Sequence, residues 1–136
     1  MKIYIDIDGV LLTKSMQPPE YSEKFIDFLT SKYNCYWLTT HCRTGENKAI
    51  QYLSNYYRDE IIEKLELIKP TDWNDKKTEG IDFSSEFIWL DDYPFNAEKQ
   101  ELIKMKSLDS LIQVDLTNEN ELKNVELKIK SLTLKS

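Results

Sequence analysis

Two aspartates, Asp6 and Asp8, close a short apolar segment near the N-terminus. Isoleucine occupies every second position from 3 to 7 and Gly9 follows Asp8, a pattern typical of a strand that ends in a turn. Residues two apart on a strand point the same way, so both carboxylates can face one reacting centre. One can attack phosphorus and form an acyl phosphate, while the other protonates the leaving oxygen and then activates water. Asp6 lies deeper in the strand and suits the nucleophile, which leaves the acid and base roles to Asp8.

A second acidic pair, Asp91 and Asp92, ends the apolar run at 87–90. Carboxylates in a buried strand cost desolvation free energy unless a cation compensates them. Attack of a carboxylate on an anionic phosphate monoester also requires charge neutralisation, which Mg²⁺ and a lysine can provide. The two pairs together therefore predict a hard, oxygen-rich Mg²⁺ site. Acids that merely cap loops are the alternative, and the same placement at two strand ends argues against it.

Hydrophobic periodicity along the chain predicts strands that alternate with helices. In chain order we expect a strand at 3–7, a helix with apolar residues from 21 to 29, a strand at 35–38, a helix at 46–57, an ambiguous segment at 61–68, a strand at 87–90, a helix capped by Asn96, a strand at 111–116 and a C-terminal helix with a capping box at Asn118 and Glu121. In the ambiguous segment, Ile61, Leu65 and Ile68 have helical spacing. Leu65, Leu67 and the closing Pro70 instead favour a strand, which we expect near the end of the segment.

This order of elements predicts an α/β fold with a parallel sheet that helices cover on both faces. In such sheets the functional site lies at the carboxyl ends of the strands. Three of the expected strands end in residues suited to chemistry, namely Asp6 and Asp8, Thr39 and Thr40, and Asp91 and Asp92. One fold would therefore bring all three groups to the same edge of the sheet.

The acidic segments resemble motifs of the haloacid dehalogenase (HAD) superfamily of phosphatases, and the resemblance covers almost the whole chain. Residues 3–10, IYIDIDGV, are similar to the first motif of the family. The resemblance implies that Asp6 is the nucleophile and a magnesium ligand. It implies that Asp8 is the acid/base and lends the metal its backbone carbonyl. Residues 88–92, IWLDD, are similar to the fourth motif, which implies that Asp91 binds Mg²⁺ directly and that Asp92 binds it through water or orients a neighbour.

Two shorter segments match the remaining motifs of the family. Residues 37–39, WLT, are similar to the second motif, whose hydroxyl and nearby amides hold the phosphoryl group, so the resemblance assigns this role to Thr39 with Thr40 as its neighbour. The third motif is a lysine that neutralises the nucleophile and the phosphate, and the resemblance indicates Lys77, with Lys76 as the alternative. All four motifs occur in the family's order and spacing. An ordinary strand-end threonine and a solvated lysine turn are the competing interpretations.

The resemblance also implies a three-layer, Rossmann-like (HAD-like) domain with a mostly parallel central sheet. The expected elements already fill the intervals between the motifs, so no cap domain fits. Capless members of the family tend to act on large substrates that cover the site themselves. The implied partner is thus a phosphorylated substrate, for which a macromolecular phosphate ester is conceivable. A capless enzyme covered by its own homo-oligomer would look the same in sequence.

Composition limits the fold and the partners. The chain has 136 residues, which is the usual size of one domain, so we expect a single domain over 1–136. Its formal net charge is −6. An acidic surface repels a phosphate backbone, so nucleic acid is disfavoured as a partner, although a local basic pocket would permit it. No apolar run approaches the roughly 20 residues that span a bilayer, so we expect a cytoplasmic protein with no membrane partner. Cys35 and Cys42 are too few for a disulfide framework and are interpreted as reduced thiols.

Three residues of mixed chemistry, His41, Cys42 and Arg43, follow the strand expected at 35–38. The planar guanidinium of Arg43 suits a substrate phosphate, whereas a surface loop with no role is an equal alternative. His41 is the single histidine, and neither cysteine has an arginine six positions on. Histidine-based and cysteine-based phosphatase mechanisms therefore lack their parts.

The function we expect is Mg²⁺-dependent hydrolysis of phosphate monoesters through an aspartyl-phosphate. The sequence does not determine the substrate, because function depends on the specific site rather than on the fold. The alternative is a catalytically weak HAD-like domain that binds metal or phosphate in regulation or interaction. Such a domain would be expected to lack the acid/base, so the presence of Asp8 argues against it. A glycosyltransferase DxD motif at Asp6 and Asp8 would leave Asp91 and Asp92 unexplained.

Overall fold

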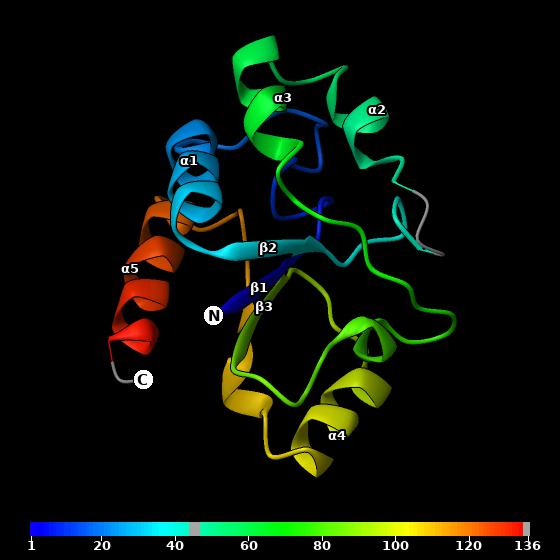
Figure 1. The fold of residues 1–136 in the computed structure, drawn as a ribbon. Coiled ribbons are helices and arrows are strands. Elements are labelled where there is room, and N and C mark those ends of the chain that lie inside the picture. Colours follow the sequence, from blue (N-terminus) through cyan, green and yellow to red (C-terminus); the bar gives the residue numbers. More distant parts are fainter. Residues whose placement is uncertain (44–46, 135–136) are drawn as a thin grey trace.

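Four parallel strands form the centre of the protein (Figure 1). The structure is a computed structural model that describes residues 1–43 and 47–134. The strands are β1 (Lys2–Ile5), β2 (Asn34–Trp37), β3 (Phe87–Asp91) and β4 (Leu111–Gln113), in the order β2-β1-β3-β4. The helices are α1 (Ser22–Lys32), α2 (Ala49–Leu53), α3 (Asp59–Leu65), α4 (Asn96–Lys104) and α5 (Glu121–Thr133), with short 3₁₀ turns η1 (Lys77–Gly80) and η2 (Leu108–Ser110). The predicted α/β class with a parallel sheet is confirmed.

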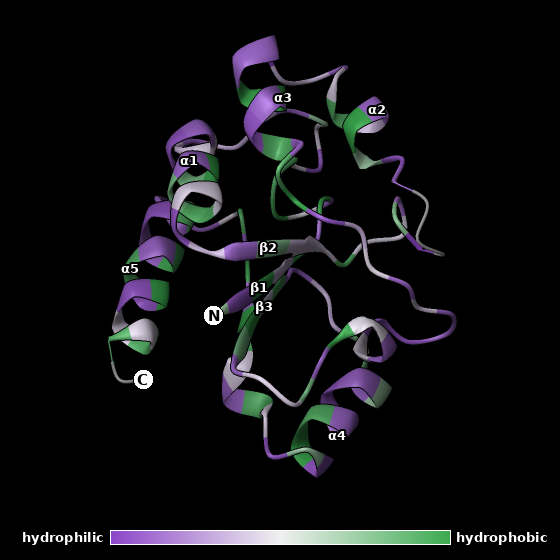
Figure 2. Cartoon of the chain, viewed as in Figure 1, coloured by the Kyte–Doolittle hydropathy of each residue, from purple (hydrophilic) through white to green (hydrophobic). Residues whose placement is uncertain are grey.

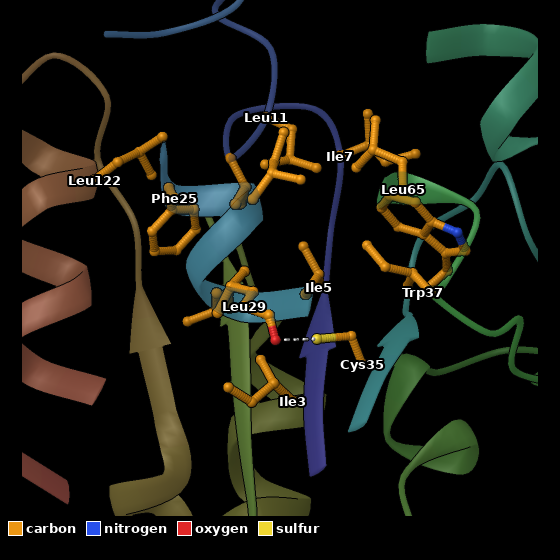
Figure 3. Close-up of a cluster of buried hydrophobic side chains, with 14 of the residues drawn as sticks. Ile3, Ile5, Ile7, Leu11, Phe25, Leu29, Cys35, Trp37, Leu65 and Leu122 are labelled. Carbon is orange, nitrogen blue, oxygen red and sulfur yellow. Dashed lines mark hydrogen bonds between the residues drawn. The ribbon is translucent and has the colours of Figure 1, made fainter. Parts of the chain in front are cut away.

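Alternate residues of the strands pack into two separate apolar clusters. Ile3 and Ile5 belong to the larger cluster, to which α1, α3 and α5 contribute Phe25, Leu65 and Leu122 (Figure 3). Tyr4 and Trp89 point to the other side and pack with Leu102 of α4. Successive strand residues face opposite sides of a sheet, and helices pack on both apolar clusters. The central strands β1 and β3 are therefore apolar on both of their faces.

Helices α1, α3 and α5 have a mainly apolar side toward the core and a mainly hydrophilic side toward solvent (Figure 2), whereas α4 buries only Glu98 and Leu102. In α1, for example, Phe25 and Leu29 are buried while Glu23 and Lys32 are exposed. Within residues 1–43 and 47–134, no helix combines the length and the apolar character needed to cross a membrane.

Residues 61–65 belong to α3 and residues 66–68 form a turn, so the expectation of a strand near the end of segment 61–68 is wrong. Ile61, Ile62 and Leu65 lie on one buried face of α3. The acidic residues of its first turn interact favourably with the positive end of the helix dipole. The strand is reduced to one parallel bridge between Lys69 and Tyr36. Lys69 donates its N–H to the Cys35 carbonyl at 3.0 Å and accepts the Trp37 N–H at 2.7 Å. The helical spacing of Ile61 and Leu65 therefore matches the structure. Pro70 follows the single bridge at Lys69 and does not end a strand.

Two predicted elements are shorter in the structure. The helix expected at 46–57 is α2, which ends at Leu53, and Glu46 lies outside the described residues. After it, the side chains of Ser54 and Asn55 bond to backbone carbonyls of the preceding turn, which competes with continuation of the helix. The strand expected at 111–116 ends at Gln113, because the Asp115 carboxylate accepts the Thr117 N–H at 3.0 Å and starts a turn.

Both predicted helix caps are wrong in detail. Asn96 is the first residue of α4 rather than its cap, and the Glu98 carboxylate accepts the N–H of Phe95, which precedes the helix. At α5 the expected capping box is replaced by a bond from the Asp115 N–H to the Glu121 carboxylate at 2.6 Å. In both places an acidic side chain of the first turn binds a backbone N–H before the helix, which satisfies a donor in a different way.

The helical assignment of α3 predicts unequal effects of two neighbouring leucines. Leu65 is fully buried and Leu67 is 63% exposed, whereas a strand would place both on the same face. We expect Leu65→Ala to lower the free energy of unfolding by about 2–5 kcal/mol and Leu67→Ala to change it by less than about 0.5 kcal/mol, as measured by urea denaturation. Similar losses in both variants would contradict the helix.

Candidate active site

Three carboxylates gather at the carboxyl edge of the sheet. Asp6 follows β1, and Asp91 and Asp92 stand at the end of β3. The Asp6 N–H donates to the Leu90 carbonyl at 3.0 Å, which extends the β1–β3 pairing by one step and sets Asp6 beside Asp91. One oxygen atom from each of the three acids lies within 4.8 Å of the others. Asp6 and Asp91 are 7% and 1% exposed, so this is a buried, negatively charged set of hard oxygen ligands that fits a divalent cation.

Lys77, whose side chain is 14% exposed, is the cation in contact with this cluster. Its Nζ lies 2.8 Å from Asp91 Oδ2 and 3.4 Å from Asp6 Oδ1. Burial on its own would lower the pKa of Lys77, but the charges of Asp6 and Asp91 outweigh it and the pKa is raised. Of the two lysines that the sequence left open, Lys77 contacts the acids, while Lys76 donates its backbone N–H to Glu79. One lysine against three acids leaves an excess of negative charge.

Burial and the nearby charge of Asp91 raise the pKa of two of the acids. Burial, followed by the nearby charge of Asp91, holds the pKa of Asp6 well above its usual range, although Lys77 lowers it. The pKa of Asp92 is also raised, first by burial and then by Asp91. A cation bound by these groups would favour their ionised forms, so its binding should release protons.

Glu98, at the start of α4, fixes the segment that carries Lys77. Glu98 is only 2% exposed, and its two carboxylate oxygens accept the backbone N–H groups of Lys77 at 2.7 Å and Phe95 at 2.8 Å. Sequence reasoning missed this residue. The available signal was an acid at the third position of a helix, but Phe95 stands where a capping box has a short polar residue.

Gly9 lets the loop after β1 approach Asp92 closely. Its φ of +83° is a left-handed conformation, and a Cβ at this position would come within 2.2 Å of Asp92 Cγ. The loop is held further by the Tyr57 hydroxyl, which donates to the Leu11 carbonyl at 2.6 Å. A residue with a side chain at position 9 would clash with Asp92, so the close packing of this loop on Asp92 requires glycine.

Asp8 lies apart from the three clustered acids and has different partners. The Tyr52 hydroxyl donates to Asp8 Oδ1 at 2.9 Å, and His41 Nε2 lies 3.1 Å from Asp8 Oδ2. The rings of His41 and Tyr52 stack with centroids 3.9 Å apart. Burial, followed by the hydrogen bond to Asp8, raises the pKa of Tyr52 to about 12. Sequence reasoning assigned no role to His41 and did not single out Tyr52, because their contact with Asp8 joins three segments far apart in the chain.

The segment after β2 places the two threonines differently. Thr39 is buried, and its hydroxyl oxygen accepts the His41 N–H at 3.4 Å, while Thr40 is exposed. The Leu38 N–H donates to the Ile5 carbonyl, so Thr39 follows at the sheet edge where Asp6 also stands. Thr39 thus lies at the same edge as the acids.

Arg43 and Cys42 tie this segment to other parts of the chain. The Arg43 guanidinium donates to the Asn74 carbonyl from Nε at 2.9 Å and also from Nη2, and it lies over the Trp73 ring. It thereby braces the segment that leads to Lys77. Cys42 is buried, and its thiol donates to the Asn47 side chain at 3.2 Å. Both cysteines are free, and burial raises the pKa of each thiol.

A cleft of about 670 Å³ opens beside the carboxylate cluster. It lies at the carboxyl ends of β1, β3 and β4, and Asp8 and Asp92 form part of its wall. Lys14, Met16, Tyr93 and Asp115 also line it. The cleft is large enough for the organic part of a small substrate.

The clustered acids predict cation binding that strengthens as pH rises. Because the pKa of Asp6 is raised by folding, stability without a cation falls as pH rises from its unfolded pKa toward the folded one. Mg²⁺ would bind the ionised acids and offset this loss. We expect Mg²⁺ at about 100 times its Kd to stabilise the fold by about 2.7 kcal/mol. In thermal unfolding, the rise in Tm should be larger at about pH 8 than at about pH 5.

Two variants test whether this stabilisation comes from the cluster. Asp92→Asn should reduce the Mg²⁺-dependent rise in Tm, whereas Asp109→Asn, which changes an exposed acid in η2, should leave it unaltered. An equal rise in Tm in wild type and Asp92→Asn would show that Mg²⁺ binds elsewhere.

The buried carboxylate of Glu98 predicts a stability loss on amidation. Glutamine has a single acceptor oxygen, so in Glu98→Gln one of the two backbone N–H groups, of Lys77 or of Phe95, loses its partner. We expect the free energy of unfolding to fall by about 1–3 kcal/mol in urea denaturation. Glu101→Gln on the same helix is the matched control and should change it by less than about 0.5 kcal/mol. Equal values for the two variants would contradict the bridging role of Glu98.

Comparison with known proteins gave no match, either to a protein-family model, to a curated protein or to a solved structure. The arrangement of the described residues therefore carries the functional argument.

Proposed function

We propose that this protein is an Mg²⁺-dependent phosphohydrolase that cleaves phosphate monoesters through an aspartyl-phosphate at Asp6. The observation that carries the proposal is the position of the Lys77 ammonium group between Asp6 and Asp91, with Asp92 in the same cluster. A largely buried lysine on a buried acid keeps positive charge where an anionic substrate and an anionic nucleophile must meet. The proposal includes the three-layer HAD-like domain that the resemblance implies.

Asp6 and Asp8 divide the chemistry. The Asp6 carboxylate attacks phosphorus, and the bond from phosphorus to the leaving alcohol breaks as the bond to Asp6 forms. Asp8 gives a proton to the leaving oxygen. Asp8 then takes a proton from a water molecule that attacks the aspartyl-phosphate, which frees inorganic phosphate and restores the Asp6 carboxylate. Their different surroundings support these roles, because Asp6 is buried beside a lysine and the Asp8 side chain is 55% exposed.

The remaining residues bind charge. Asp6, Asp91 and Asp92 would hold Mg²⁺, with the backbone carbonyl of Asp8. When bound, the metal supplies positive charge that offsets the repulsion between carboxylate and phosphate. Thr39 and Thr40 are proposed to bind the phosphoryl oxygens. Lys76 and Arg43 are proposed as further phosphate contacts.

The cleft beside Asp8 is the proposed place of the leaving group. Asp8 and Asp92 form part of its wall, so an alcohol released toward Asp8 would enter it. The cleft carries Asp8, Asp92 and Asp115 against Lys14, and this negative balance disfavours a leaving group with further phosphates. The proposed partner is therefore a phosphorylated substrate whose organic part bears little negative charge.

The proposal is tested by hydrolysis of an aryl phosphate with Mg²⁺ or with chelator. We expect turnover only with Mg²⁺, and we expect Asp6→Asn to lower it by at least about 10³-fold because the nucleophile is lost. Asp8→Asn should lower hydrolysis of an alkyl phosphate by about 10²–10⁴-fold. Asp109→Asn, the exposed acid in η2, is the control and should retain full activity.

Two outcomes would contradict the phosphohydrolase proposal. Folded wild-type protein that binds Mg²⁺ but turns over neither aryl nor alkyl phosphates would favour a regulatory module that binds metal or phosphate. Full activity of Asp6→Asn would show that another group is the nucleophile.

A further inference from the structure

The side chain of Asp8 is the exposed member of the acidic residues at the sheet edge. It belongs to the loop that begins after β1, and more than half of its surface is open to solvent. An exposed aspartate normally samples several rotamers, and ordering it costs conformational entropy. A group that must deliver a proton to one oxygen atom needs a defined position, since small misplacements lower the rate strongly.

Two groups hold both oxygens of this carboxylate: the Tyr52 hydroxyl is a donor, and His41 is a donor when its Nε2 carries the proton. Tyr52 donates to Oδ1 at 2.9 Å, and His41 Nε2 stands 3.1 Å from Oδ2. The donors come from α2 and from the segment after β2, so two different elements constrain Asp8. A carboxylate has about four lone-pair sites, and two donors leave one on each oxygen for the reacting groups.

The two donors are themselves fixed. The His41 and Tyr52 rings stack at an interplanar angle of 17°, so each limits the rotation of the other. Tyr52 also packs edge-on against Tyr56. Next to Tyr52 in α2, Leu53 is fully buried in the larger apolar cluster, which anchors the helix to the core.

The held carboxyl group faces the cleft rather than the clustered acids. Asp8 contributes to the cleft wall, and the cation-binding group formed by Asp6, Asp91 and Asp92 does not include it. We propose that Tyr52 and His41 are positioning residues that hold the Asp8 carboxyl group in place for proton transfer to the leaving oxygen. This inference rests on the proposed phosphohydrolase function.

A positioning role for Tyr52 and His41 predicts that their loss affects substrates differently according to the leaving group, which a purely structural role does not predict. An alkoxide leaving group needs a proton in order to depart, whereas a nitrophenolate is stable without one. Loss of the positioned acid should therefore slow alkyl phosphates much more than nitrophenyl phosphates. The ratio kcat/KM reports the steps up to release of the alcohol, so it isolates the acid step from the later hydrolysis of the aspartyl-phosphate.

The experiment compares kcat/KM of wild type and Tyr52→Phe for an alkyl phosphate and for p-nitrophenyl phosphate. We expect a loss of about 10–100-fold on the alkyl phosphate and of less than about 3-fold on the nitrophenyl phosphate. Tyr56→Phe, a neighbouring tyrosine in the same aromatic group, is the matched control and should leave both values near wild type.

His41→Phe provides a second variant that keeps a ring on Tyr52 and removes the nitrogen near Asp8. It should show the same selective loss on the alkyl phosphate, and it tests the proposal if Tyr52→Phe fails to fold. Equal losses on both substrates, or no loss on either, would overturn the positioning role. Absence of turnover in wild type would instead contradict the proposed function, so the two failures are distinguishable.

Discussion

The ion pairs of Lys77 with Asp6 and Asp91 are the interaction on which the site depends. A buried charge costs several kcal/mol unless a partner compensates it, and here two buried acids share one lysine. The remaining negative charge, to which Asp92 adds, is what makes a bound cation favourable. Without Lys77 the carboxyl ends of β1 and β3 would place two unpaired charges in the interior, next to strands that are otherwise apolar.

Several contacts of the surrounding chain keep Lys77 where these acids need it. Glu98 binds the Lys77 backbone from α4, and Arg43 stacks on Trp73 and bonds to Asn74 just before it. The segment is therefore held both by α4 and by the residues that follow β2. Because Lys77 belongs to a short 3₁₀ turn with little stability of its own, its position comes from these tertiary contacts.

Asp6 and Asp8 are two residues apart and have opposite surroundings. Asp6 is buried beside Lys77, and its pKa is raised by burial and by Asp91. Asp8 is exposed, and its partners are a hydroxyl and an imidazole. Gly9 follows directly in a left-handed conformation, at the point where the loop lies against Asp92. Different environments for equal side chains are the usual way in which a site separates a nucleophile from an acid.

The sequence by itself determined the parallel α/β fold, because the alternating apolar runs and the polar residues at their ends are local patterns. The resemblance of its motifs also indicated Lys77 as the lysine that neutralises the nucleophile, with Lys76 as the alternative. Only the tertiary structure decided which lysine meets the acids, that α3 ends in a turn after Leu65 rather than in a strand, and that Tyr52, His41 and Glu98 lie in the candidate site. The side-chain contacts among these features join segments far apart in the chain, and no spacing along the sequence records them. Segment 61–68 had the apolar spacing of both a helix and a strand, so its packing had to decide.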